Sequence, residues 1–365
     1  MKQLVLLGAG HAHVQVLKSL IEAPLTEVEV TLISPYGRQV YSGMLPGWVA
    51  GHYALEDCVI PLAPLVIKAG VQFRQTAALH IDFMSKEIHC ANGDKVTFDL
   101  LSIDTGPVAD LSMILGAAEH AISIRPIEAF IESFQRIKNK ILARSTGHKT
   151  RIVFVGAGAG GIELALAMQH AFSSGVAVTL ISATNTLPGS VGPRLARMLA
   201  QQGVTMLSNQ SASRIEHGAV HLLSGDIIEA DIIIAATGAT AAGWLGKSGL
   251  QTDKRGFVLV NDYLQSVSHE NVFAAGDCAT MINFVRPKSG VYAVRAGPPI
   301  ARNLRHYLNN EALVAYAPQA RSLYLVSTGD KYAIASWGNF ALQGHWVWRW
   351  KDRIDRGFMA KYALK

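Results

Sequence analysis

Residues 4–20 read LVLLGAGHAHVQVLKSL, and residues 151–168 read RIVFVGAGAGGIELALAM. Each stretch is an apolar strand that runs into a glycine turn and then into a helix. A turn of this kind places a dinucleotide pyrophosphate against the N-terminus of the helix. One such turn is a weak signal, but two in one chain favour a protein that holds two dinucleotides. Such a protein usually moves electrons between them, which points to a flavin and a nicotinamide.

Each glycine of the turn has a steric role. The first permits the tight turn, the second lets the backbone approach the phosphates, and the third allows the helix to pack closely on the strand. The second copy has all three, as Gly156, Gly158 and Gly161. The first copy has Gly8 and Gly10, followed by His11, Ala12 and, in the third position, His13. Local packing and a direct phosphate contact are equally good interpretations of the two histidines.

The residue that binds the adenosine ribose is expected about 20 residues beyond each turn. The second strands, EVEVTLIS and VAVTLIS, end at Ser34 and Ser182. A serine hydroxyl hydrogen-bonds a ribose less strongly than a carboxylate does. After Ser182 no arginine follows until Arg194, so no clamp for a 2′-phosphate is evident. Both serines are predicted cofactor contacts, and the choice between NADH and NADPH stays open.

Composition narrows the class of protein. The length of 365 residues suggests two or three domains, and 50% apolar residues favour a large core. The net charge of +6 is explained in part by the phosphates of two dinucleotides, and no nucleic-acid-binding module is present, so no nucleic-acid partner is expected. The three cysteines lie far apart without metal or redox spacing. We therefore expect no metal site, a reducing cytoplasmic compartment, no signal peptide and no membrane-spanning segment.

The two halves of the chain have the same order of predicted elements. In each half a dinucleotide unit is followed by short alternating strands and by a closing strand, which ends at Thr105-Gly106 in the first half and at Thr237-Gly238 in the second. Residues 35–64 lack periodicity and predict a long loop. Residues 125–143 predict a helix, and Gly276-Asp277 predicts the start of another.

These features together resemble the superfamily of flavoproteins with two dinucleotide-binding domains. There the first turn holds FAD, the second holds NAD(P)H, and the aspartate of a late AGD motif binds the FAD ribityl chain. Here that motif is VFAAGDCA, with Asp277. Within the superfamily the chain looks most like the branch of type II NADH dehydrogenases and sulfide:quinone oxidoreductases, because YSGMLPG (residues 41–47) is similar to their flavin-facing loop.

Three further segments resemble the FAD-dependent oxidoreductase domain that is fused to selenide, water dikinase. They are GAGHAHVQVLK, PKSGVYAVRAGP and WVWRWKDRIDRGFM. The resemblance implies an α/β fold with two Rossmann-like FAD- and NAD(P)-binding domains, the second inserted in the first. The predicted FAD-binding domain comprises residues 1–108 and 246–315, the NAD(P)-binding domain residues 109–245, and a C-terminal interface segment residues 316–365.

The resemblance also implies site residues. Lys288, before a helix, is predicted to stabilise negative charge on the reduced flavin, and Glu163 is predicted to lie near the nicotinamide. Further predicted cofactor contacts are Arg38, Met44, Leu45, Pro46, Ala78, Thr105, Gly106, Thr237, Gly238, Gly276, Asp277, Gly290 and Tyr292. FAD is the expected cofactor and NAD(P)H the expected co-substrate.

The predicted function is an FAD-dependent oxidoreductase that passes hydride from NAD(P)H to flavin and then to an unidentified acceptor. Quinone is one candidate, although the AQxxxQ helix of type II NADH dehydrogenases reads YAVRAG here, at residues 292–297. The alternative is an FAD-binding partner module of a selenide, water dikinase system with little NAD(P)H turnover.

The tail from Trp346 to Lys365 combines aromatic and basic residues. On a helix its predicted apolar face contains Val347, Trp350, Ile354, Phe358 and Lys361. Trp, Phe and basic residues together suit the surface of a bilayer, here the inner face of the cytoplasmic membrane. Packing on the protein itself or on a second copy in a homodimer is the alternative.

Overall fold

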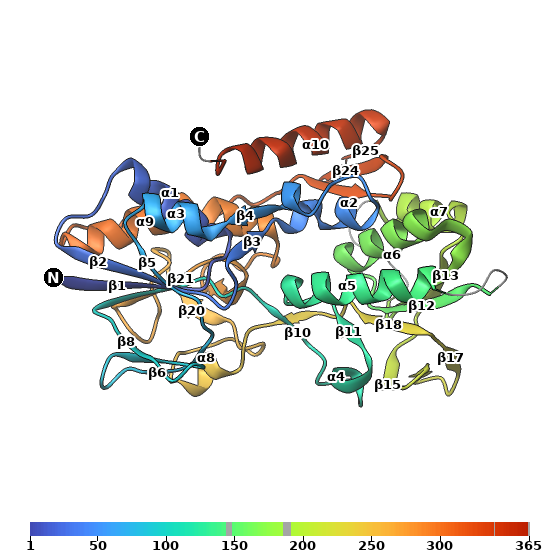
Figure 1. Cartoon of the computed structure of the whole chain (residues 1–365), viewed down its shortest axis with the longest axis horizontal. Coiled ribbons are helices and arrows are strands. Elements are labelled where there is room, and N and C mark those ends of the chain that lie inside the picture. The colour runs from blue at the N-terminus through green and yellow to red at the C-terminus, as the bar shows by residue number, and fades with distance from the viewer. Residues whose placement is uncertain (144–147, 185–190, 339, 364–365) are drawn as a thin grey trace.

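The computed structural model describes residues 1–365 except 144–147, 185–190, 339, 364 and 365 (Figure 1). Its first half is built on a five-stranded parallel sheet in the order β21-β9-β1-β2-β5. The strands are β21 (Val272–Ala274), β9 (Leu100–Ile103), β1 (Lys2–Leu7), β2 (Val28–Ile33) and β5 (Gln72–Arg74). The last four residues of β1 and all four residues of β9 are buried, which is typical of a parallel sheet that is covered on both faces.

Helices α1 (His11–Glu22), α3 (Leu62–Lys68) and α9 (Gly290–Leu308) cover one face of this sheet (Figure 1). On the other side lies an antiparallel sheet of β6 (Ala78–Asp82), β7 (Glu87–Cys90) and β8 (Lys95–Thr97), together with α8 (Trp244–Lys247). Strand β21 comes from residues that follow the second half, so the first sheet is discontinuous in sequence.

The second half repeats the plan with a parallel sheet in the order β11-β18-β12-β13-β14. Its strands are β11 (Ile122–Ser123), β18 (Ile232–Ala235), β12 (Thr150–Val155), β13 (Val176–Ser182) and β14 (Thr205–Ser208). Its helices are α4 (Ala117–His120), α5 (Ile127–Leu142), α6 (Ala159–Phe172) and α7 (Gly192–Gln201). Strands β15 (Ala212–Glu216), β16 (Ala219–Leu222) and β17 (Ile227–Glu229) form its antiparallel sheet.

Two connecting segments join the halves. They pair as the antiparallel strands β10 (Val108–Ala109) and β19 (Ala239–Thr240). The α/β class with two Rossmann-like units is therefore confirmed, whereas the predicted boundaries at residues 108, 245 and 315 stay a prediction.

Residues 35–64 are more ordered than predicted. Strands β3 (Arg38–Val40) and β4 (Val59–Pro61) pair there, and the 3-10 turns η1 (Ser42–Met44) and η2 (Glu56–Cys58) flank α2 (Leu45–Val49). All five residues of α2 are buried, and the helix packs against α6. A five-residue helix is too short to show periodicity in sequence, so this element could not be found from pattern.

The predicted helix at Gly276-Asp277 is wrong. These residues form the single 3-10 turn η5 (Gly276–Cys278), which leads into β22 (Ala279–Met281), the parallel partner of β20 (Val258–Val260). A three-residue turn has no helix macrodipole of consequence, so the carboxylate of Asp277 draws no such support.

The C-terminal segment forms the antiparallel sheet β23 (Tyr324–Ser327), β24 (Ala333–Trp337) and β25 (Phe340–Gly344), followed by α10 (His345–Ala360). Helix α10 lies across both halves (Figure 1). Its buried face carries Val347, Lys351, Asp355 and Phe358, whereas Trp350 and Ile354 are exposed. The predicted single apolar face is therefore wrong: Val347 and Phe358 pack on the protein, and Trp350 and Ile354 do not.

Candidate functional site

The first glycine turn leaves no room for side chains. Gly8 has a φ of +91°, and a Cβ there would lie 2.4 Å from the carbonyl oxygen of Asp104. A Cβ on Gly10 would lie 2.3 Å from the carboxyl carbon of the same residue. The Gly10 N–H donates to the Asp104 carbonyl at 3.0 Å, which ties the turn to the end of β9.

His13 packs beneath this turn. Its Nδ1 donates to the carbonyl of Gly8, and its Nε2 accepts from the hydroxyl of Ser102 at 2.8 Å. Burial lowers its pKa to about 4, so the ring is neutral. Both ring nitrogens are used inside the core, which favours the packing interpretation of His13 over a phosphate contact.

His11 is placed differently. Its Nδ1 accepts from the Gln39 amide at 2.8 Å, so Nε2 carries the ring proton, and this buried atom has no hydrogen-bond partner among the described residues. A Cβ on Gly290, the first residue of α9, would lie 3.9 Å from Nε2. The buried hydroxyl of Ser289 likewise lacks a described partner.

Unpartnered donors at the N-terminal ends of α1 and α9 are what a bound dinucleotide would satisfy. The residues present at the first turn therefore fit FAD. Ala12, at the start of α1, is fully buried, and Gly276 and Gly290 lie against Asp104 and His11. Tyr292 lines a neighbouring cavity together with Gly276.

Asp277 lies at the edge of this region within a set of charges. Its carboxylate accepts from the Ser289 N–H and faces Arg125 and Lys288; burial raises its pKa, and the two cations oppose that rise. Arg125 precedes α5 in the second half, and its two described hydrogen bonds, both with the Ser123 hydroxyl, involve only its backbone. The charge of a guanidinium in the second half thus acts on the predicted ribityl ligand of the first half.

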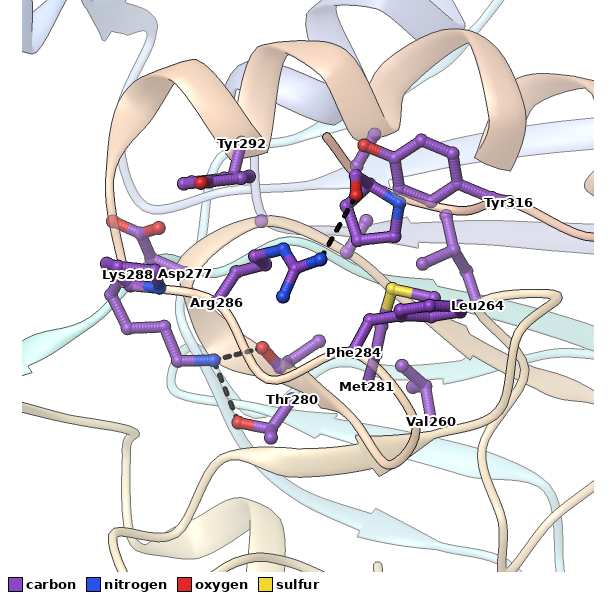
Figure 2. Close-up of a pocket in the computed structure, with 16 residues that line it drawn as sticks. Val260, Leu264, Asp277, Thr280, Met281, Phe284, Arg286, Lys288, Tyr292 and Tyr316 are labelled. Atoms are coloured by element: carbon purple, nitrogen blue, oxygen red, sulfur yellow. Dashed lines mark hydrogen bonds between the residues drawn. The ribbon is translucent and has the colours of Figure 1, made fainter. Parts of the chain in front are cut away.

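A small cavity of about 60 Å³, partly open to solvent, lies beside Asp277 (Figure 2). Arg286 projects into it and is held by the carbonyls of Val285, Pro318 and Gln319. Lys288 turns toward β22, where its ammonium donates to the Ala279 carbonyl and to the Thr280 hydroxyl. The charge-stabilising role of Lys288 stays a prediction, because this contact directs its ammonium at β22.

The second turn repeats the steric pattern. Gly156 has a φ of +115°, and a Cβ there would lie 2.3 Å from the Ala236 carbonyl oxygen. A Cβ on Gly161 would lie 2.3 Å from the Gly156 carbonyl oxygen, and Gly158 faces open space. Thr237 donates to the Asp110 carbonyl at 2.7 Å and is followed by Gly238. The helix α6 therefore begins at an open turn suited to a second pyrophosphate.

The two predicted ribose serines take part in local turns. The Ser34 hydroxyl donates to the Tyr36 carbonyl and accepts from the Tyr36 N–H. The Ser182 hydroxyl accepts from the Thr184 N–H at 3.4 Å. Both serines are buried, so each hydroxyl is already engaged at the end of its strand, and a ribose contact stays a prediction.

The remaining predicted residues are spread around the first turn. Arg38 forms a bidentate ion pair with Glu128 of α5 at 2.8 and 2.9 Å, so it links the two halves. Met44, Leu45 and Pro46 are buried in η1 and α2. Ala78 begins β6, and Thr105 and Gly106 follow β9, where Thr105 is exposed.

Glu163 points at the C-terminal segment. Its carboxylate accepts from the Ser327 N–H at 2.8 Å, and burial raises its pKa to about 7 against the opposing charge of Lys351. Lys351 is ion-paired with Asp355 and donates to the Gly43 carbonyl, while the Tyr41 hydroxyl donates to Asp355 at 3.1 Å. This cluster joins α6, the 41–47 loop and α10.

Three of these residues were missed by sequence reasoning: Asp104, Arg125 and Lys351. Lys351 lies within the quoted tail segment, Asp104 precedes Thr105-Gly106 and Arg125 begins the predicted helix 125–143, but sequence reasoning gave none of them a role. Each is brought to the site by tertiary contacts, and a local pattern carries no signal for such contacts.

Known proteins share the sequence and the fold of this chain to different degrees. Residues 2–297 match the model of the family described as pyridine nucleotide-disulphide oxidoreductase. The chain belongs to this family. It is 25% identical over 328 residues to the NADH dehydrogenase-like protein YutJ of Bacillus subtilis, and the aligned region covers 87% of each chain. It is 25% identical over 350 residues to a type II NADH:quinone oxidoreductase of Staphylococcus aureus, which covers 85% of this chain and 84% of that one.

The fold is shared with the sulfide:quinone oxidoreductase of Aquifex aeolicus, with a TM-score of 0.81 and 19% identity over 99% of this chain and 91% of that one. As a member of the pyridine nucleotide-disulphide oxidoreductase family, the chain is an FAD-dependent oxidoreductase with NAD(P)H as co-substrate. Its three cysteines are free and buried, so it has no disulfide beside the flavin region. No described group of His, Cys, Asp or Glu could hold a metal ion.

Proposed function

We propose that this member of the family passes electrons from NAD(P)H through FAD to a membrane quinone. The overall reaction converts NAD(P)H, a proton and a quinone into NAD(P)⁺ and a quinol. Bound FAD supplies the two-electron carrier between the hydride donor and the acceptor. The quinone reductase of Staphylococcus aureus noted above supports this choice of acceptor.

The observation that carries the proposal is the double role of α10. On one face, Phe358 stacks on Tyr41 and on His11 at the first turn, and Tyr362, beyond the helix, donates to Gln15 of α1. On the other face, Trp346, Trp350 and Ile354 are exposed beside Arg349 and Arg353. One helix thus covers the flavin region and offers a surface suited to a bilayer, where quinones are dissolved.

Two further aromatic side chains are exposed on the strands that precede α10. Trp337 is 60% exposed and Phe340 is 82% exposed, at the ends of β24 and β25. Exposed aromatic side chains gathered on one element are unusual for a surface that faces only water. In the described part of the chain, no helix is both long and apolar enough to cross a bilayer. We infer attachment at the membrane surface, on the cytoplasmic side.

Each site residue has a role of its own in this proposal. The N-terminal ends of α1 and α9, with His11 and Asp277, hold the flavin nucleotide, and the turn at Gly156 holds the nicotinamide nucleotide. Glu163 can hold a proton near neutral pH, because burial brings its pKa to about 7. Lys351 and Asp355 pair with each other beside Glu163, and the bond from Lys351 to the Gly43 carbonyl holds the 41–47 loop beneath α10.

The test is steady-state oxidation of NADH and NADPH with three acceptors: a soluble dye, a short-chain quinone and a long-chain quinone in anionic liposomes. We expect turnover with both quinones and faster turnover with the liposomes. Turnover with the dye alone would show that the acceptor is wrong. No turnover with any acceptor would favour the alternative, a partner module for a selenide, water dikinase.

A further inference from the structure

Asp104 is a buried carboxylic acid at the end of β9. It is 2% exposed, and its Oδ2 accepts from the N–H groups of Ala12 and His13 at 2.8 and 3.0 Å. These are donors in the first turn of α1 that the helix itself leaves unpaired. The N-cap residue is Gly10, which has no side chain, so Asp104 caps the helix from another strand.

The other carboxyl oxygen faces the cofactor segments. A Cβ on Gly276 would lie 2.3 Å from Oδ1, and a Cβ on Gly10 would also lie 2.3 Å from it. The carboxyl group is therefore wedged between the first glycine turn and the Gly276-Asp277 turn. Every hydrogen bond described for this carboxyl group goes to Oδ2.

The second half provides an internal comparison. The residue whose carbonyl backs Gly156 is Ala236, as Asp104 backs Gly8. The sequences that follow are Ala236-Thr237-Gly238 and Asp104-Thr105-Gly106. No side chain caps the N-terminus of α6 in the described structure. Apart from His13 and Gly161 at the third motif position, the two turns thus differ in a buried acid, which is present only at the turn predicted to bind FAD.

The charges around Asp104 oppose its ionisation. No Lys, Arg or His among the described residues forms an ion pair with it, and the nearest acid is Asp277. His13 is neutral, the buried Cys278 thiol has its pKa raised to about 12, and Arg125 and Lys288 face Asp277. Burial raises the pKa of Asp104 to about 7, and the charge of Asp277 adds to the rise, although the N–H groups of His13 and Ala12 oppose it. A cofactor diphosphate beside the carboxyl would raise the pKa further.

We propose that Asp104 is a cofactor-binding residue that is protonated on Oδ1 when FAD is bound and donates a hydrogen bond to the diphosphate. The ionised form would instead repel the diphosphate at close range. FAD binding therefore takes up a proton at Asp104. FAD affinity falls as the pH rises above the pKa of the free carboxyl, by up to about tenfold per pH unit.

The test uses the flavin-loaded protein. Protein diluted to a series of low concentrations is equilibrated between pH 6 and pH 9, and released FAD is measured by its fluorescence. We expect the dissociation constant to be constant near pH 6 and to rise up to about tenfold per pH unit above about pH 7. A dissociation constant that does not change with pH would overturn the proposal, whatever the variants do.

Two variants test whether Asp104 causes the pH dependence of FAD affinity. Asp104→Asn keeps the shape and a donor, so we expect it to retain FAD with little dependence on pH. Asp277→Asn removes the other acid near the diphosphate and should keep the wild-type slope. An Asp104→Asn protein with the wild-type slope, or with FAD lost equally at every pH, would show that Asp104 acts as an ionised cap. If Asp104→Asn does not fold, a loss of slope in Asp277→Asn contradicts the proposal independently.

Discussion

At the scale of single residues, Asp277 is the strongest test of the flavin site. It is half-buried, is bonded to the start of α9 and interacts with the charges of Arg125 and Lys288, so its removal leaves these two cations without an acid that opposes their charge. We expect Asp277→Ala to lower the FAD content of the purified protein at least several-fold. The measurement is the ratio of flavin to protein absorbance. Asp226→Ala, at an exposed turn of the second half, is the control and should keep full occupancy.

Glu163 predicts a pH dependence of turnover. Its pKa of about 7 means that the carboxyl is protonated below neutral pH and ionised above it. The protonated form of such a group, which supplies a proton during quinone reduction, becomes depleted as the pH rises. The kcat should therefore fall above about pH 7.

Glu163→Gln can still accept from the Ser327 N–H but cannot release a proton. We expect a lower kcat with a flattened alkaline limb, measured with a soluble quinone. Glu216→Gln, on β15, serves as the control. A Glu163→Gln profile that keeps the wild-type shape would remove Glu163 from proton transfer.

The residues of the site fall into two groups, according to whether their contacts lie near to them or far from them in the sequence. Gly8, Gly10, Gly156 and Asp277 could be found from sequence, because their roles follow from backbone geometry within a short motif. Arg125, Lys351 and Asp104 could not, because each meets its partner through residues distant in the chain. His13 was ambiguous for the same reason: Ser102, which engages its Nε2, lies on another strand.

At the scale of elements, α10 predicts attachment to anionic membranes. Trp350 and Ile354 lie one turn apart on the exposed face, and neither contributes to the buried one. We expect the Trp350→Ser, Ile354→Ser double variant to lower the fraction bound to anionic liposomes, with a loss of roughly tenfold or more in partitioning. Added salt should weaken the wild-type binding, because Arg349 and Arg353 also face outward.

The matched control is Leu223→Ser, an exposed apolar residue of the second half. Deleting the whole helix would be a poor test, since Val347 and Phe358 belong to the core. Wild-type protein that stays in solution at low salt with liposomes present would rule out this attachment.

The helix itself was predictable, but its orientation was not. A hydropathy pattern places charged residues outward, whereas Lys351 and Asp355 are buried because they pair with each other and with Gly43 and Tyr41. A hydropathy pattern also could not reveal α2, because its five residues are held in place by packing on α6. Strong periodic elements such as α5 follow from sequence, and short packed ones do not.

At the scale of the whole molecule, the second half predicts little discrimination between NADH and NADPH. Ser182, at the position predicted to contact the ribose, already bonds Thr184 and offers neither a carboxylate nor a cation. We expect the kcat/KM values for the two nucleotides to differ by less than about a hundredfold, or about 2.7 kcal/mol. A larger ratio, measured with the same acceptor, would show a determinant beyond Ser182; residues 185–190 lie outside the described part of the chain.

The overall architecture was the most predictable level. Two strand–turn–helix units, each followed by short strands, specify two parallel sheets, and the late AGD motif indicates that the first unit is completed after the second. How the halves face each other was not predictable. Arg38 and Glu128 form an ion pair between them, and Arg125 crosses the same junction, yet neither contact leaves a trace in local sequence.

The position of α10 bears on how the loaded protein is made. The helix follows both halves in the chain and lies against the first turn through Phe358 and His11. We therefore expect the flavin to enter before this helix docks and to leave when the helix lifts. Attachment of the outer face to a membrane would hold the helix down, so the flavin should be retained longer on vesicles than in free solution.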